Sequence, residues 1–249
     1  MPAYVWPLAA GIVLALVYAL RGSTGEDPFS ARFWARRRWV SAAAGVSVAY
    51  VFVDVLPELG ALGATLHAHG GGIGTLFGEE RIYVLTLLSF LVMYGLQNIV
   101  LAAKEVRGVS AERSETDKIY WLHLVGYAAY SALIGYLLVE RAEQGLKVLA
   151  FYTSAMAIHL VVVNHSLAEA HEALYRQQGR WLLAAAVLAG TAVGWTVPIS
   201  ETWFARLFAV LAGGVVITSL RAELPDDSRG RFWPFCLAAL GYAFLLLAA

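Results

Sequence analysis

Long apolar runs follow one another along this chain, separated by short polar segments. Most of them approach the ~20 residues that a helix needs to cross about 30 Å of hydrocarbon. None alternates apolar and polar residues with the period of two that is typical of a barrel strand. Because backbone groups in hydrocarbon must be satisfied internally, the runs predict helices. Eight spans are expected, at residues 2–20, 39–59, 82–103, 119–139, 148–167, 181–200, 207–220 and 232–249.

Composition supports a membrane class. The chain is 59% hydrophobic and only 14% charged, with a mean hydropathy of +0.64, far from the balance of soluble domains. We therefore expect an all-α integral membrane protein, a single polytopic domain over residues 1–249 in contact with lipid. The formal net charge is zero and the basic residues are scattered, so nucleic acid is not expected as a partner. The first run is interpreted as a retained span, and the compact chain favours a bacterial plasma (inner) membrane.

The distribution of Lys and Arg predicts the orientation. Loops after the first, third, fifth and seventh spans contain 14 of the 18 basic residues, and such loops face the cytoplasm. Both termini are therefore expected on the non-cytoplasmic side. The same side carries a Gly-rich segment at residues 60–78, interpreted as a flexible connector. Its His67 and His69 leave weak metal binding as an alternative.

Two spans end in the same short motif. The second ends in Leu56-Pro57-Glu58, and the seventh, which is short and expected to run on toward Pro225, ends in Leu224-Pro225-Asp226. Since the second span exits outward and the seventh inward, the two are related by an axis in the membrane plane, as in the inverted repeats of secondary transporters. The alternative is ordinary helix-end chemistry, because proline ends helices and acids lie in the flanking water.

Candidate site residues are concentrated in the fifth span, which places His159, Asn164 and His165 inside an apolar run. Polar groups at membrane depth are costly unless partnered, and they often mark an ion path. His165 and Glu169 lie four residues apart, on one helical face. Imidazole with carboxylate suits Zn²⁺, which takes about four ligands in proteins. The predicted topology places His123 and Glu223 near the same cytoplasmic end. The metal candidates are therefore His123, His159, Asn164, His165, Glu169 and Glu223.

Each candidate also has a structural interpretation. His165 with Glu169 fits an amphipathic helix end among headgroups, and His123 fits a satisfied core histidine. His159 fits the same role if it is bonded to Thr153, Ser154 or a tyrosine.

Polar residues in other spans have two interpretations as well. Asp54 and Glu58 form either an acidic cation funnel at the outer mouth or a pair of solvated acids. Gln97 and Asn98 are expected to form hydrogen bonds between helices.

These features together resemble the ZIP (Zrt-, Irt-like) divalent metal transporters, which have eight spans, both ends outside, and Leu-Pro-acid motifs. Members carry His-Asn-x-Pro-Glu-Gly in the fourth span and His-Glu-x-Pro-Glu-Gly in the fifth. Here, residues 159–164 keep the first His but lose both acids, the Pro and the Gly. In the fourth span, Gly126 and Tyr130 stand where His and Glu would be. The resemblance implies a divergent member with a rebuilt or lost central site, and it suggests a homodimer.

Three functions follow. The first is a permease for a zinc-like divalent cation, which is then the substrate. The second is a membrane protein without metal transport, serving as a sensor, a scaffold or a carrier of another solute. The third, a metal-dependent intramembrane hydrolase, is disfavoured because Asp54 and His165 are expected at opposite depths. Nucleophile, phosphate-loop and metalloprotease motifs are missing from the sequence, so neither an enzyme nor an organic cofactor is expected.

Overall fold

A computed structural model describes residues 5–20, 33–69, 81–106, 113–223 and 232–248, which are almost entirely helical. Two short segments, η1 and η4, are π-helices, whose turns are wider than those of an α-helix. In chain order the elements are α1 (Val5–Leu20), α2 (Phe33–Tyr50), η1 (Val51–Val55), α3 (Leu56–His69), α4 (Arg81–Val106), α5 (Arg113–Glu143), α6 (Leu146–Leu174), η4 (Tyr175–Gly179), α7 (Arg180–Thr196), α8 (Glu201–Glu223) and α9 (Phe232–Ala248).

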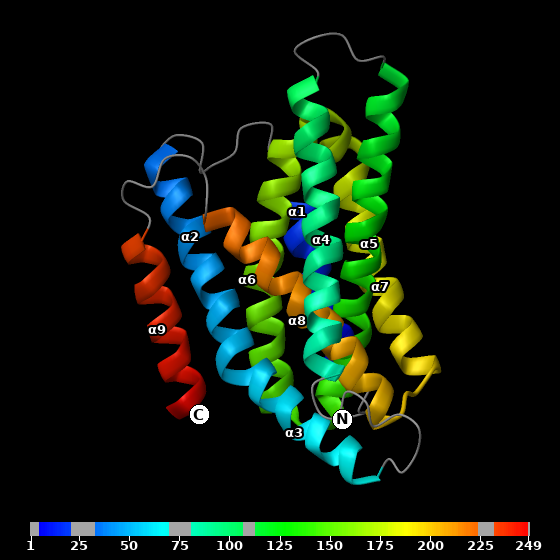
Figure 1. The fold of residues 1–249 in the computed structure, drawn as a ribbon, viewed down its shortest axis with the longest axis vertical. Helices are drawn as coiled ribbons and strands as arrows, with labels where there is room; N and C mark the ends of the chain where they lie inside the picture. The colour runs from blue at the N-terminus through cyan, green and yellow to red at the C-terminus, as the bar shows by residue number, and fades with distance from the viewer. Residues whose placement is uncertain (1–4, 21–32, 70–80, 107–112, 224–231, 249) are drawn as a thin grey trace.

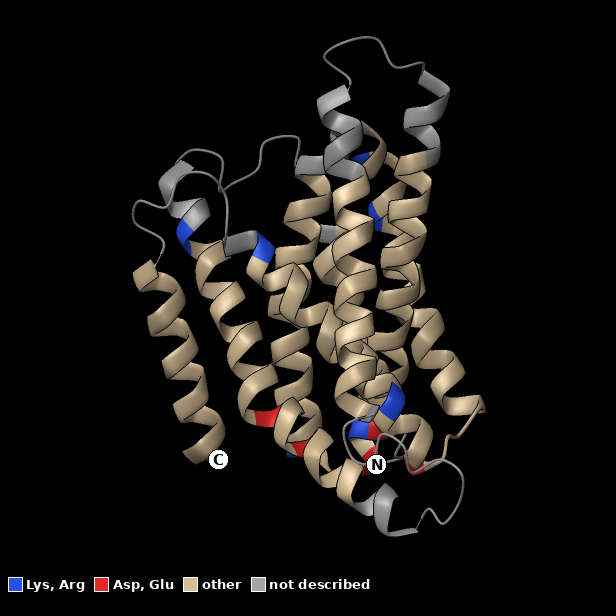
Figure 2. Cartoon of the chain, in the orientation of Figure 1, with Lys and Arg blue, Asp and Glu red and all other residues tan. Residues whose placement is uncertain are grey.

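The all-α prediction is confirmed, and the helices have membrane character. Five helical stretches are long and apolar enough to cross a membrane, at residues 38–64, 82–99, 119–143, 146–168 and 201–221, and residues 5–19 and 232–248 form shorter apolar helices. In the described part of the chain, charged residues gather toward the two ends of the bundle and leave an uncharged middle zone (Figure 2). This is the arrangement expected of an integral membrane protein.

Two predicted extensions are confirmed. The fifth span continues as the polar end of α6, and the seventh runs on to Glu223 in α8.

The boundary at the end of the second span was predicted wrongly. Residues 56–69 form α3, so the predicted connector at residues 60–78 is helical over its first half, and Pro57 lies inside a continuing helix. A proline removes one helical hydrogen bond and crowds the carbonyl four residues earlier. That carbonyl belongs to Val53, within η1, where the wider turn gives the ring room.

Small residues bring α5 and α7 into close contact. A Cβ atom on Gly135 would collide with the carbonyl of Val187, and one on Gly190 would collide with the carbonyl of Ala132. Gly194 lies against the carbonyl of Tyr136 in the same way, further along both helices. Such small-residue contacts are a common way for helices to associate in membranes, where packing replaces the hydrophobic effect between helices.

The outer elements pair as α2 with α9 and α4 with α8. In Figure 1, α2 and α9 both run downward, whereas α4 and α8 both run upward. The two pairs therefore run in opposite directions.

Candidate functional site

His159 lies at the centre of the bundle and is fully buried on α6. Its Nε2 atom is 3.3 Å from the hydroxyl oxygen of Tyr130 on α5 and 3.5 Å from Oγ1 of Thr218 on α8. Three helices therefore meet around one imidazole. Of the alternatives predicted for this residue, a tyrosine partner is present, whereas Ser154 bonds to the Phe151 carbonyl and Tyr242 instead.

The hydrogen bonds around His159 assign the ring tautomer. The Tyr130 hydroxyl donates to the Leu211 carbonyl, and the Thr218 hydroxyl donates to the Gly214 carbonyl at 2.7 Å. Since each hydroxyl has one proton, both oxygens act as acceptors toward the imidazole, which places the proton of the neutral ring on Nε2. Nδ1 is then a buried lone pair, and it has no hydrogen-bond partner among the described residues.

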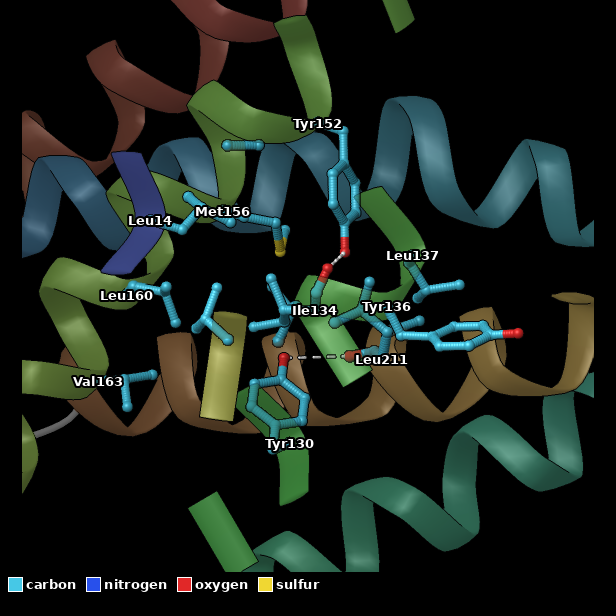
Figure 3. Packing of buried hydrophobic residues seen from close by; sticks show 14 of the residues in the cluster. Leu14, Tyr130, Ile134, Tyr136, Leu137, Tyr152, Met156, Leu160, Val163 and Leu211 are labelled. Carbon is cyan, nitrogen blue, oxygen red and sulfur yellow. Dashed lines mark hydrogen bonds between the residues drawn. The ribbon is translucent and has the colours of Figure 1, made fainter. Parts of the chain in front are cut away.

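Tyr130 reaches this position because α8 has a glycine opposite it. A Cβ atom on Gly214 would overlap the Tyr130 ring. The phenol therefore lies flat against α8 and points toward the Leu211 carbonyl, as Figure 3 shows. A second buried phenol, Tyr152, donates to the Ile134 carbonyl at 3.0 Å in the same view. Both of these buried hydroxyls are thus bonded to backbone carbonyls, which compensates for their burial.

Asn164 holds three elements together. Its side-chain nitrogen donates to the Val17 carbonyl of α1 at 3.2 Å, and its oxygen accepts from the Tyr175 hydroxyl of η4 at 2.6 Å. Both ends of the amide are therefore used in contacts between elements. Asn164 was predicted as a metal candidate, and in this conformation its oxygen is already an acceptor for Tyr175.

His123 and His165 are both buried. His123 on α5 is 5% exposed and lies edge-on to Tyr127, with ring centroids 4.9 Å apart. His165 on α6 is 8% exposed. The side chains of Glu169 and Glu223 lie outside the described residues, although both residues belong to helices. Among the side chains that are described, no three or more His, Cys, Asp or Glu gather closely enough to hold a metal ion.

A second polar cluster surrounds Arg141, near the end of α5. Arg141 is 2% exposed, and its two terminal nitrogens lie 2.8 and 2.6 Å from the two carboxylate oxygens of Glu58. Asp54 lies 3.6 Å from the same guanidinium, and Gln144 accepts a hydrogen bond from it at 2.6 Å. Asp54 and Glu58 are thus neither a free cation funnel nor plainly solvated acids. The predicted fourth span ends at residue 139, which places Arg141 in the loop that follows it, so this cluster was not predicted.

Gln97 and Asn98 on α4 behave as predicted. Gln97 donates to the Tyr127 hydroxyl of α5 at 2.8 Å, and Asn98 accepts from Arg221 of α8. Both residues form hydrogen bonds between helices, which confirms their structural interpretation. They tie α4 to α5 and to α8.

No protein-family model matches this chain, and no curated protein matches it.

Proposed function

We propose that this chain is a permease of ZIP-like architecture, built as an inverted repeat and working by alternating access, with a zinc-like divalent cation as its substrate. The observation that carries the proposal is a pair of helix contacts that the repeat relates to each other. The alignment that superposes Leu56-Pro57-Glu58 on Leu224-Pro225-Asp226 also superposes Gly45 on Gly213, since each glycine precedes its proline by 12 residues.

The two glycines make equivalent contacts. A Cβ atom on Gly45 of α2 would collide with the backbone of Phe235 in α9, and one on Gly213 of α8 would collide with the backbone of Thr86 and Phe90 in α4. A repeat that exchanges α2 with α8 and α4 with α9 converts one of these contacts into the other. Leu-Pro-acid alone is open to explanation as helix-end chemistry. Helix-end chemistry does not explain why two aligned glycines also make equivalent backbone contacts, so that explanation would need a separate coincidence.

The direction of the helices supports the same relation. The α2–α9 pair and the α4–α8 pair run in opposite directions, each pair being parallel within itself (Figure 1). A two-fold axis in the membrane plane reverses direction in this way. Transporters with such repeats bind substrate near the middle of the bilayer, at the repeat interface. In this chain α2 and α8, which the proposed repeat exchanges, are in direct contact, and α8 also carries Thr218, which lies 3.5 Å from the imidazole of His159.

The choice of a metal cation rests on the donor atoms near this interface. Three imidazoles, those of His123, His159 and His165, are buried on α5 and α6, and neutral imidazole is a preferred ligand of zinc. His159 directs its proton toward two hydroxyls, which leaves Nδ1 as the donor atom for a cation. The carboxylates of Glu169 and Glu223, both on the cytoplasmic side of the predicted topology, are expected to join His165 and His123 there, with His159 as a deeper station on the path.

The test is metal flux into proteoliposomes that contain the purified protein, across a panel of Zn²⁺, Fe²⁺, Mn²⁺ and Cd²⁺. Zn²⁺ or a similar ion should enter, and His159→Ala should lower the rate at least about tenfold, because loss of one ligand bond costs more than 1.4 kcal/mol. Ser154→Ala is the matched control, since this residue lies on the same helix but is exposed and bonds to Tyr242. Equal rates in liposomes with and without protein, for every ion, would refute metal transport.

A binding measurement tests the ligand set separately. Zinc affinity, measured by calorimetry on the detergent-solubilised protein, should fall in the double variant His165→Ala/Glu169→Ala. Unchanged affinity would remove these two residues from the site.

A second candidate is a carrier of another solute, and a specific observation favours it. Asn164 is bonded to Tyr175 and to the Val17 carbonyl, and the Nε2 atom of His159 lies within 3.5 Å of the Tyr130 and Thr218 hydroxyls. Polar groups that already bond to protein partners are less available as metal ligands. Such groups suit a path for a solute that is recognised by hydrogen bonds. This candidate predicts a transporter that takes none of the four metals.

A further inference from the structure

The Arg141 cluster joins elements from all over the chain at one end of the bundle. Arg141 belongs to α5, Asp54 to η1 and Glu58 to α3. The guanidinium also lies over the ring of Phe208 in α8, 4.2 Å from its centroid, and within 5.8 Å of the ring centroid of Tyr152 in α6. One side chain therefore links its own helix to four other segments, among them the end of the repeat unit that contains α2, η1 and α3.

The geometry of the ion pair is specific. One terminal nitrogen donates a hydrogen bond to one Glu58 oxygen, and the other lies 2.6 Å from the second oxygen as an ion pair, so the planar guanidinium faces the whole carboxylate, which a lysine ammonium cannot do. Arg141 is 2% exposed while Glu58 is 25% and Asp54 is 35% exposed. The guanidinium is thus packed against aromatic rings in the interior, and the carboxylates of Glu58 and Asp54 lie between it and the surface. Separation of Glu58 from Arg141 would leave a buried charge without its main partner, which is strongly unfavourable.

The segment that carries the two acids is also the least regular part of its helix. Asp54 lies in the π-helix η1, and Glu58 follows Pro57 in the first turn of α3. Wider turns of this kind often occur at functional sites and at places where a helix bends. A bend at η1 would move α3, and with it Glu58, away from α5 without unfolding α2.

We propose that Arg141, Glu58 and Asp54 form a latch that keeps this end of the bundle closed in the described conformation and that opens by a bend at η1. The inference rests on the proposed alternating-access function, because a latch has a role only if this end opens. It assigns to Arg141 a positioning role, since it acts through α3 and not on the substrate. The latch predicts that removal of the ion pair raises the population of molecules open at this end.

The test measures water access directly and needs no transported substrate. Cys236 is replaced by Ala, and Ser47→Cys supplies a reporter on α2. Ser47 is fully buried and bonds only to the Ala43 carbonyl of its own helix among the described contacts, so the exchange is nearly isosteric. It lies about 10 Å along the helix from Asp54, at 1.5 Å per residue. The readout is the rate at which a small, charged thiol reagent labels the reporter thiol in reconstituted membranes.

Arg141→Gln should raise the labelling rate about tenfold, a shift that corresponds to loss of about 1.4 kcal/mol from the closed state. Arg206→Gln is the matched control. Arg206 is an exposed arginine on α8 that stacks over the ring of Trp203, and its loss should leave the rate unchanged. Arg141→Lys, which keeps the charge but not the fork, should lie between the two.

A second variant tests whether misfolding, and not opening of the latch, explains faster labelling. Arg141→Met/Glu58→Leu removes both members of the pair and leaves no buried charge, an exchange that folded proteins often tolerate. It should also label faster than the parent. Unchanged labelling in both Arg141→Gln and the double variant, each monodisperse in detergent, overturns the latch. Faster labelling without metal flux supports the latch and removes the metal substrate, so the two proposals fail separately.

Discussion

Gly45 and Gly213 offer the sharpest test of the packing on which the repeat depends. Alanine at either position places a Cβ atom against the backbone of the neighbouring helix, at Phe235 or at Thr86. Backbone atoms cannot rotate away as the tip of a side chain can, so one helix of each pair must shift. We expect Gly45→Ala and Gly213→Ala to destabilise the protein by similar amounts.

The magnitude follows from two opposing contributions. Overpacking in a well-packed interior costs about 1–3 kcal/mol, while exchange of a helical Gly for Ala gains up to about 1 kcal/mol. Because the collision is with backbone, the cost lies in the upper part of this range, so the net loss is about 1–2 kcal/mol, which lowers Tm by about 2–8 °C for a chain of this size. Gly95 and Gly241 have no atom within 4 Å of an added Cβ, so alanine there should leave Tm unchanged or raise it.

The assay is thermal unfolding in detergent micelles, followed by intrinsic tryptophan fluorescence. Gly126→Ala is an instructive intermediate, because its Cβ would meet only the methyl end of Leu96, which can rotate aside. The double variant Gly45→Ala/Gly213→Ala should lose the sum of the single losses within about 0.5 kcal/mol, since the two contacts share no partner. If Gly45→Ala is as stable as Gly241→Ala, the close α2–α9 contact is wrong and the repeat loses its main support.

Two further predictions concern the polar interior. Asn164→Ala should destabilise by about 1–3 kcal/mol, because it leaves the buried Tyr175 hydroxyl without its acceptor, and Tyr175→Phe should cost less, since Asn164 keeps its bond to α1; equal losses in urea-induced unfolding would contradict this order. Tyr130→Phe should cost only about 1 kcal/mol, because Thr218 still accepts from His159. Nitrogen chemical shifts of the His159 ring should report the Nε2-protonated tautomer in both the parent and this variant, and a ring protonated on Nδ1 would show the assignment to be wrong.

Sequence patterns predicted the helices well, because hydropathy over about 20 residues is a local property. They failed where a local signal has two meanings. Pro57 was interpreted as the end of a helix, but the helix continues through it by way of η1. Gly45 and Gly213 were predictable from the sequence. When the two Leu-Pro-acid motifs are aligned, the glycine 12 residues before one proline aligns with the glycine 12 residues before the other.

The ion pair of Arg141 with Glu58 was beyond such reasoning. The two residues are 83 positions apart, and nothing in the local sequence of either distinguishes a buried charge from a loop charge. Burial of Arg141 is decided by the aromatic rings of α6 and α8 that enclose it, which only the tertiary fold brings together. For His159, the sequence predicted the class of partner, a hydroxyl, whereas the identity of Tyr130 and Thr218 depends on the packing of α5 and α8.

The distribution of charge separates the two candidate cargoes. Among the buried side chains of the described residues, Arg141 is the only one with a permanent charge, and it is neutralised at the end of the bundle. Where the resemblance places a glutamate, the chain has Tyr130, a neutral phenol that meets His159. A divalent cation drawn from water into this centre requires anionic compensation, because an uncompensated buried charge is very costly. Only carboxylates such as those of Glu169 and Glu223 can supply it, whereas a neutral solute needs none. Glu169→Gln with Glu223→Gln should therefore abolish transport if the cargo is a metal and spare it if the cargo is uncharged.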